Sequence, residues 1–303
     1  MHSLSSPPLL YRGRFAPSPT GPLHFGSLIA AVASYLEARK QKGEWLVRME
    51  DVDENRNQTG AADSILHTLD NYGFEWDGEV LYQTQRKPAY TEALQQLDTQ
   101  NLIYRCTCSR KDLHQQAAQG EYGFIYPGTC KHLQHSPATE HALRIKTHDD
   151  PIEFTDAIMG IYGQQLKSDI GDFIIRRRDG LFAYQLAVVV DDAWQNITDI
   201  IRGYDLLDST PRQIYLQQCL GYTTPSYTHL PIAVNDRGDK LSKQTGAAGI
   251  NEKADIEALV NCMNFLGQAM PVGLKKASPK TFWQWAFENW DLNKVPKQTK
   301  ISV

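Results

Sequence analysis

The chain has 303 residues, of which 41% are hydrophobic and 22% are charged. This length supports one large domain with an insertion or two modest domains, and the sequence shows no signal peptide, lipidation motif or apolar span of membrane length. The formal net charge of −4 excludes a chain that attracts nucleic acid through its overall charge. We therefore expect a cytoplasmic protein without a membrane partner, in which any nucleic-acid surface is a local patch.

The first hundred residues alternate between predicted strands and predicted helices. Apolar runs at residues 11–16 and 44–50 have the length of strands, whereas residues 26–38, 61–72 and 87–99 have helical periodicity. Strands that alternate with helices favour a parallel sheet covered by helices. The fold class is therefore expected to be α/β.

A turn rich in proline and glycine joins the first predicted strand to the first helix. Residues 14–27 read Arg-Phe-Ala-Pro-Ser-Pro-Thr-Gly-Pro-Leu-His-Phe-Gly-Ser. A strand, a turn and a helix N-terminus in succession form a common anion site. His24 can donate a hydrogen bond to a phosphate oxygen, and Gly26 lets the backbone approach a nucleotide because it has no Cβ. Taken alone, the segment is equally compatible with a tight surface turn and an ordinary half-buried histidine.

Three of the five cysteines lie close together in the sequence, at Cys106, Cys108 and Cys130. Cysteines of an intracellular chain seldom form disulfides, whereas three thiolates suit a tetrahedral zinc ion. Tyr126 and His132 are the candidates for a fourth ligand, and imidazole is the commoner zinc ligand of the two. The glycine-rich segment between the cysteines has little apolar content to fix its own shape, so a structural role is expected.

The pattern changes after the cysteines. Residues 142–146 and 152–166 alternate between apolar and polar residues, which predicts antiparallel strands in an insertion. The α/β character resumes at Phe173. The expected regions are a catalytic domain in two halves at residues 11–105 and 173–250, a zinc-bearing insertion at 106–172 and a helical region at 251–303.

Another strand and helix follow in the second half. Residues 196–203 have an apolar centre that is typical of an inner strand. A helix is predicted from about Pro211 to Leu220, with Ser209 and Thr210 before the proline as its cap.

A second loop with phosphate-binding chemistry follows far downstream. After the turn-rich residues 236–239, the chain reads Lys240-Leu241-Ser242-Lys243-Gln244. Lysine is a compact charge on a flexible stem, which suits phosphates whose charge grows in a transition state. A lone pair of lysines is usually a solvated surface pair. Combined with the first loop, the pair indicates an enzyme that attacks ATP at the α-phosphate.

The two loops resemble the HIGH and KMSKS signatures of class I aminoacyl-tRNA synthetases. The Arg-Phe-Ala-Pro-Ser-Pro-Thr-Gly run and Arg48-Met49-Glu50-Asp51 are similar to the glutamyl branch. The Pro-Leu-His-Phe-Gly-Ser and Lys-Leu-Ser-Lys-Gln versions, with the chain length, resemble the shortened glutamyl-queuosine tRNA(Asp) synthetases in particular. The resemblance runs from about Tyr11 to the second signature. Two residues depart from the usual pattern, because Ser27 stands where histidine or glycine is normal and Leu241 replaces methionine.

The resemblance implies a Rossmann-like class I catalytic domain with a zinc-bearing insertion and a small helical C-terminal region. It also implies a pocket for L-glutamate in which Glu50 faces the ammonium group and Arg202 binds the side-chain carboxylate. A forked guanidinium suits a carboxylate, and an arginine at the end of an apolar strand is costly to bury unless it is paired. The implied glutamate-binding residues are Arg14, Phe15, Ala16, Pro17, Ser18, Glu50, Tyr184 and Arg202. A simple salt bridge between Glu50 and Arg48 remains the alternative.

The resemblance also implies the groups that handle ATP and zinc. The ATP-binding residues are His24, Gly26, Ser27, Lys240, Ser242 and Lys243, of which His24 and Lys243 are catalytic. The implied zinc ligands are Cys106, Cys108, Tyr126 and Cys130, which favours Tyr126 over His132. Mg²⁺ is expected to accompany ATP without a dedicated protein site. Asp191 and Asp192 are expected to be structural or close to the nucleotide and not to bind a metal.

The implied reaction has two steps. The α-carboxylate of glutamate attacks the α-phosphorus of ATP, and the glutamyl group then passes to a hydroxyl on RNA. About sixty residues follow Gln244, which is too short for the anticodon-binding domain of an ordinary glutamyl-tRNA synthetase. The expected acceptor is therefore queuosine in the anticodon stem-loop of tRNA(Asp), and the chain is expected to act as a monomer. The alternatives are a truncated glutamyl-tRNA synthetase, a non-catalytic RNA-binding relative and a small-molecule adenylate-forming ligase.

Overall fold

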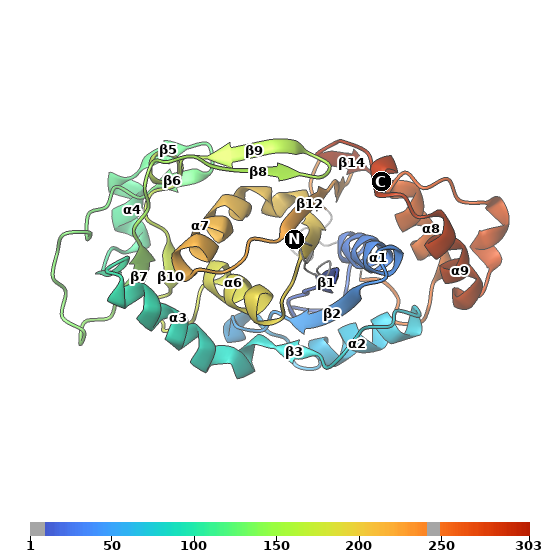
Figure 1. Cartoon of the computed structure of the whole chain (residues 1–303), viewed down its shortest axis with the longest axis horizontal. Coiled ribbons are helices and arrows are strands. Elements are labelled where there is room, and N and C mark those ends of the chain that lie inside the picture. Colours follow the sequence, from blue (N-terminus) through green and yellow to red (C-terminus); the bar gives the residue numbers. More distant parts are fainter. Residues whose placement is uncertain (1–9, 241–248) are drawn as a thin grey trace, which may run out of the picture.

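The computed structural model describes residues 10–240 and 249–303, which form an elongated molecule with α1, β1 and β2 near its middle (Figure 1). The described α-helices are α1 (Phe25–Lys40), α2 (Ala61–Asn71), α3 (Lys87–Thr99), α4 (Arg110–Gln116), α5 (Leu166–Asp169), α6 (Tyr184–Trp194), α7 (Thr210–Leu220), α8 (Ile256–Phe265) and α9 (Pro279–Asn289). The described strands are β1 (Arg12–Phe15), β2 (Glu44–Met49), β3 (Leu81–Tyr82), β4 (Ile103–Cys106), β5 (Ala118–Gly120), β6 (Gly123–Ile125), β7 (Ala142–Ile145), β8 (Ile152–Asp156), β9 (Gly160–Gln164), β10 (Ile174–Arg176), β11 (Asp199–Gly203), β12 (Ser226–Leu230), β13 (Ile232–Val234) and β14 (Lys300–Ser302).

Parallel strands form the centre of the molecule. β1 pairs with β2 and β2 with β3, while β11 pairs with β12, in every case in parallel. The backbone amide of Thr198 donates to the carbonyl of Arg12 over 3.0 Å, which brings β11 beside β1. The α/β class that the alternation of strands and helices predicts is confirmed.

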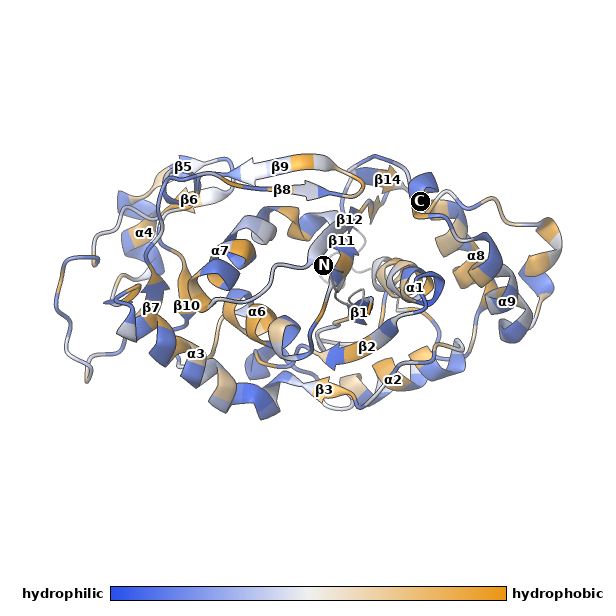
Figure 2. Cartoon of the chain, viewed as in Figure 1, coloured by the Kyte–Doolittle hydropathy of each residue, from blue (hydrophilic) through white to orange (hydrophobic). Residues whose placement is uncertain are grey.

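Helix α1 is buried almost all round, because its residues from Leu28 to Ala38 are nearly all apolar (Figure 2). It packs on β1 and β2 on one side and on α8 and α9 on another. Its N-terminus is capped by His24, whose Nδ1 accepts a hydrogen bond from the Ser27 amide over 3.2 Å. This hydrogen bond ties the end of the first loop to the start of α1.

A second core lies around α6. The apolar run Leu186–Val190 is fully buried against α3, α7 and β10. Its C-terminal half continues into the buried acids Asp191 and Asp192. The helix therefore carries two carboxylates into the interior, where each must be paired.

The alternating segments form antiparallel strands, as predicted. β7 lies between β4 and β10 and is antiparallel to both, and β8 forms a hairpin with β9. The hairpin is not separate from the centre of the molecule, because Asp156 at the end of β8 bridges in parallel to Tyr227 of β12. This bridge places Asp156 next to β12, where its carboxylate meets His229.

The predicted cap of α7 is wrong. Ser209 makes no side-chain cap bond, because a 3₁₀ helix over Tyr204–Ser209 runs directly into α7. The Ser209 hydroxyl instead accepts hydrogen bonds from Gln185 and Arg212. The proline is the second residue of the helix, in the first turn, where its missing amide costs no hydrogen bond.

The C-terminal region packs onto the body of the molecule. Trp283 and Trp290 are buried, and their indole nitrogens donate to the Tyr72 carbonyl (2.8 Å) and the Glu37 carboxylate (2.7 Å). These two tryptophans therefore belong to the core, and β14 pairs in parallel with β13. Within residues 10–240 and 249–303, no helix has the length and apolar character needed to cross a membrane.

Candidate active site

A cavity of about 580 Å³ opens at the carboxyl ends of β1, β2 and β11. Its lining contains every predicted glutamate- and ATP-binding residue that the structure describes: Arg14, Phe15, Ala16, Pro17, Ser18, His24, Gly26, Ser27, Glu50, Tyr184, Arg202 and Lys240. Residues that are up to 226 positions apart in the sequence thus share one cavity. The predicted Ser242 and Lys243 lie outside the described residues.

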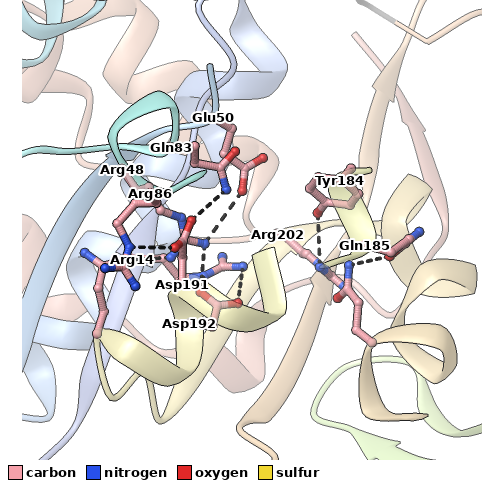
Figure 3. A network of polar contacts seen from close by, with 12 residues as sticks. Arg14, Arg48, Glu50, Gln83, Arg86, Tyr184, Gln185, Asp191, Asp192 and Arg202 are labelled. Atoms are coloured by element: carbon pink, nitrogen blue, oxygen red, sulfur yellow. Dashed lines mark hydrogen bonds and ion pairs between the residues drawn. The ribbon is translucent and has the colours of Figure 1, made fainter. Parts of the chain in front are cut away.

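Arg14 and Arg48 are held by one carboxylate, Asp192 (Figure 3). Asp192 Oδ1 lies 3.0 Å from Arg14 Nε and 2.7 Å from Arg48 Nη2. Burial alone would raise the pKa of Asp192, but the two guanidinium groups outweigh it and lower that pKa. The carboxylate is therefore ionised, and it fixes both arginines beside the cavity.

Glu50 lies beside this cluster but is not firmly paired within it. Its Oε1 is 3.6 Å from Arg48 Nη2, whereas Arg48 makes shorter hydrogen bonds to Asp192 and Gln195. Burial raises the pKa of Glu50 to about 7, because the attraction of Arg48 and Arg14 does not compensate for lost solvation and the acids at positions 191 and 192 oppose ionisation. A cation that entered the cavity would restore the ionised form.

Arg202, at the end of β11, is held differently. Its Nε donates to His229 Nε2 over 3.0 Å, and its Nη2 donates to Thr210 Oγ1 over 2.7 Å. Its Nη1 faces the Tyr184 hydroxyl at 3.4 Å (Figure 3). Arg202 and Tyr184 therefore border the cavity together, on the opposite side from Glu50.

The first loop meets the N-terminus of α1 at the other end of the cavity. Because His24 Nδ1 accepts from the Ser27 amide, the proton of the neutral ring lies on Nε2, where it can be donated to a phosphate oxygen. Ser27 thus uses its backbone to orient the histidine. Lys240 reaches the same cavity, and its Nζ lies 2.5 Å from the Asp205 carboxylate.

Sequence reasoning missed several residues that shape the cavity. Asp192 had no assigned partner, Thr210 was expected only as part of a helix cap, and Asp205 and His229 were not singled out. Asp192 could have been suspected as a partner for arginine, since a buried acid needs one. His229 gave no signal, because a single histidine in a strand has many uses.

The cysteine cluster forms a second candidate site, next to β4. Among the residues the structure describes, one group of possible metal-binding side chains comes together. It consists of Cys106, Cys108 and Cys130, whose sulfur atoms lie within 4.8 Å of one another. Burial would raise the pKa of Cys130, but hydrogen bonds from the Thr107 backbone and the His135 side chain outweigh it and lower that pKa to about 6. One thiolate is thus already favoured at neutral pH, as a metal ligand requires.

Tyr126 is the candidate fourth ligand that lies at this cluster. Its hydroxyl is 3.4 Å from Cys106 Sγ and accepts a hydrogen bond from the Cys130 amide over 2.9 Å. Gly171 makes this position possible, because its φ is +76° and a Cβ there would lie 2.3 Å from the Tyr126 carbonyl oxygen. His132, the alternative ligand, is exposed to solvent.

Comparison with known proteins adds independent information. Residues 11–271 match the family model described as tRNA synthetases class I (E and Q), catalytic domain. The glutamyl-Q tRNA(Asp) synthetase of Dechloromonas aromatica is 54% identical over 293 residues, covering 96% of this chain and 97% of that protein. The protein of the same name from Neisseria meningitidis serogroup C is 52% identical, covering 95% of this chain and 98% of its own length.

A solved structure has the same fold. The glutamate-tRNA synthetase of Elizabethkingia anophelis superposes with a TM-score of 0.78 at 25% sequence identity, and the match covers 97% of this chain but 68% of that one. The predicted family resemblance is therefore confirmed by both sequence and fold. The chain belongs to the class I tRNA synthetases of the E and Q type.

Proposed function

We propose that this chain activates L-glutamate with ATP and transfers the glutamyl group to queuosine, the wobble base of tRNA(Asp). The observation that carries the proposal is similarity at 51–54% identity over 95–96% of the chain to relatives that bear the name glutamyl-Q tRNA(Asp) synthetase. The acceptor is the anticodon stem-loop, and the protein acts as a monomer in the cytoplasm.

The charges around the cavity support glutamate as the substrate. Glutamate has two carboxylates and one ammonium group, and the cavity offers Arg202 and Arg14 for the former and Glu50 for the latter. The substrate ammonium would ionise Glu50, and a carboxylate would pair with the guanidinium of Arg202. Tyr184, whose hydroxyl faces Arg202, can donate to the same carboxylate.

The first step is an in-line displacement at the α-phosphorus of ATP. The glutamate α-carboxylate oxygen forms the new P–O bond, the bond to the β-phosphate oxygen breaks, and the products are glutamyl-adenylate and pyrophosphate. His24 donates from Nε2 to a phosphate oxygen, and the N-terminus of α1 adds its positive dipole. Lys243 supplies a cation for the phosphates, and Lys240 and Ser242 complete the ATP-binding residues that the sequence predicts. Mg²⁺ bound to ATP would neutralise phosphate charge.

The insertion has a structural role in this proposal. Its residues 106–172 join the two halves of a Rossmann-like catalytic domain, and Cys106, Cys108, Cys130 and Tyr126 would hold zinc. Three soft thiolates within 4.8 Å of one another fit the ligand preference of zinc, and the Tyr126 oxygen lies against them. The ion would fix the shape of a segment whose apolar cluster is small.

The test is a transfer assay with labelled glutamate and ATP. We expect label in queuosine-containing tRNA(Asp) and in its isolated anticodon stem-loop, and none in tRNA(Asp) that lacks queuosine. Removal of the terminal adenosine should leave labelling unchanged. Label that requires the 3′ end and ignores the wobble base would instead identify a glutamyl-tRNA synthetase.

A simpler assay separates the remaining alternatives. Pyrophosphate exchange that depends on glutamate identifies an adenylate-forming enzyme for this amino acid. A non-catalytic RNA-binding relative would give no exchange, and a small-molecule ligase would give exchange with a different acid.

A further inference from the structure

Within residues 10–240 and 249–303, the hydrogen-bond partners of Arg202 include no acid. Its hydrogen-bond partners are His229 Nε2, Thr210 Oγ1, the Leu206 carbonyl oxygen and the Tyr184 hydroxyl. Arg202 is 5% exposed, so its charge is largely removed from water. An uncompensated buried cation is costly to keep. The arrangement therefore leaves a positive charge available for a ligand.

Arg14 shows the contrast within the same cavity. Two of its nitrogens, Nε and Nη2, face the carboxylate of Asp192 at 3.0 and 3.4 Å. Arg14 is thus already paired with an acid. Of the two arginines that line the cavity from the central strands, Arg202 is the one whose described hydrogen bonds all go to uncharged acceptors.

A neutral imidazole, that of His229, lies between Arg202 and Asp156. His229 Nδ1 lies 2.7 Å from Asp156 Oδ2, and its opposite nitrogen, Nε2, lies 3.0 Å from Arg202 Nε. A carboxylate accepts only, so the ring proton must be on Nδ1 and Nε2 must be the acceptor. A protonated ring would point an N–H at the Arg202 N–H, and burial together with Arg202 lowers the pKa of His229 to about 4 despite Asp156.

Asp156 and His229 are rigidly placed. The other carboxylate oxygen of Asp156 accepts from the amides of Ile158 and Met159, at 2.9 and 2.8 Å. His229 is fully buried in β12 and stacks on Tyr227 with an interplanar angle of 8°. The acid therefore cannot swing toward Arg202, and the ring cannot turn away from it.

We propose that Asp156 and His229 are positioning residues for Arg202 that give the site its preference for a carboxylate. Asp156 selects the tautomer of His229, and the imidazole then aims Arg202 into the cavity without cancelling its charge. A glutamate carboxylate gains the full attraction of this cation, whereas the uncharged carboxamide of glutamine does not. This inference rests on the proposed function, because it takes glutamate to be the substrate.

The experiment compares three variants by glutamate-dependent pyrophosphate exchange. H229N retains a donor toward Asp156 but has no acceptor at the position of Nε2. H229Q extends an amide oxygen to that position, so it can still accept from Arg202 Nε. In D156N the amide oxygen keeps the hydrogen bonds from the Ile158 and Met159 backbone amides, so the NH₂ group faces His229. His229 Nδ1 must then accept, which moves the ring proton to Nε2 and sets it against the Arg202 N–H.

We expect H229N and D156N to raise KM for glutamate by roughly ten- to a hundredfold, the range for a lost hydrogen bond to a charged group. KM for ATP should change little, and the preference for glutamate over glutamine should fall. H229Q should stay within about threefold of the unsubstituted chain, because it restores the acceptor.

Each other outcome overturns the inference. Equal losses in H229N and H229Q would indicate a merely structural histidine, and an unchanged D156N would refute the selection of the tautomer. If H229N does not fold, D156N decides alone. When the unsubstituted chain exchanges pyrophosphate with glutamate, such results leave the proposed function intact; absence of that exchange in the unsubstituted chain overturns both.

Discussion

Glu50 makes the binding of glutamate depend on pH in a way that can be measured. In the proposed complex its carboxylate pairs with the substrate ammonium, so the free protein must give up the Glu50 proton before or during binding. Burial raises the pKa of Glu50 from its ordinary value of 4.5 to about 7. Glutamate itself keeps its ammonium and both carboxylates in the range between pH 6 and 8. The titration of the binding step in this range therefore belongs to the protein.

The size of the effect follows from that pKa. At pH 6 about one-tenth of the free protein has Glu50 ionised, so KM for glutamate should be roughly tenfold higher at pH 6 than at pH 8. Raising the pH should therefore strengthen the binding of glutamate but lower the stability of the free protein. Because the folded state holds the Glu50 proton more tightly than the unfolded chain, stability falls as pH rises from 4.5 through 7. The full loss is about 3 kcal/mol above pH 7.

The assay is pyrophosphate exchange at saturating ATP between pH 6 and 8, with KM for glutamate as the readout and E50Q as the control. E50Q should bind glutamate weakly and lose the slope in this range, because its amide does not titrate. Its thermal unfolding should also lose the pH-dependent term that Glu50 contributes. A flat KM profile for the unsubstituted chain, or an unchanged slope in E50Q, would refute the pairing of Glu50 with the ammonium.

Three further predictions concern other parts of the molecule. D192N should lower the free energy of unfolding in urea titrations by about 3 kcal/mol, because it leaves Arg14 and Arg48 buried without their acid. The control is D208N, which removes a half-exposed pair with Arg212 that is 3.6 Å long and should change the free energy of unfolding little. Equal effects of the two substitutions would contradict the role of Asp192. C130S should lose bound zinc in metal analysis whereas H132A should retain it, and the reverse result would move the fourth ligand to His132. W283A should destabilise the protein by about 3–5 kcal/mol in the same titrations without changing KM for glutamate, since Trp283 is core; an unchanged midpoint would show that this ring is not part of the core.

The secondary structure was largely predictable because local patterns determine it. The helix predicted at residues 87–99 has those bounds, and the strands at 11–16 and 44–50 are one or two residues shorter than expected. The cap at Ser209 failed because the preceding residues are already helical, which depends on the long-range packing of Tyr204–Ser209 and not on the local turn residues. Local reasoning cannot distinguish a free helix start from one that continues a 3₁₀ turn.

The candidate site was predictable only where a motif carried it. The loop at residues 14–27 has a recognisable spacing, and most of its residues line the cavity. The partners of those residues have no such spacing: Asp192 meets Arg14 across 178 sequence positions, and Asp156 meets His229 across 73. A carboxylate in a helix or a hairpin does not show which distant cation or imidazole it will face. Such pairs follow from the packing of α6 and β8 against the central strands.

Arg14 and Arg202, the two arginines that line the cavity from the central strands, differ in how their charges are compensated. Both lie on central strands, and the resemblance assigns both to glutamate. Asp192 offsets the charge of Arg14 and Arg48, whereas Arg202 is held by an imidazole, a hydroxyl, a carbonyl and a phenol. A buried cation without an acid raises the free energy of the empty protein, and a bound carboxylate relieves that cost. Glu50 shows the same principle with the opposite sign, because its raised pKa is relieved by a bound ammonium. A zwitterion with a second carboxylate supplies both charges, which is why an amino acid without a side-chain carboxylate should bind this cavity poorly.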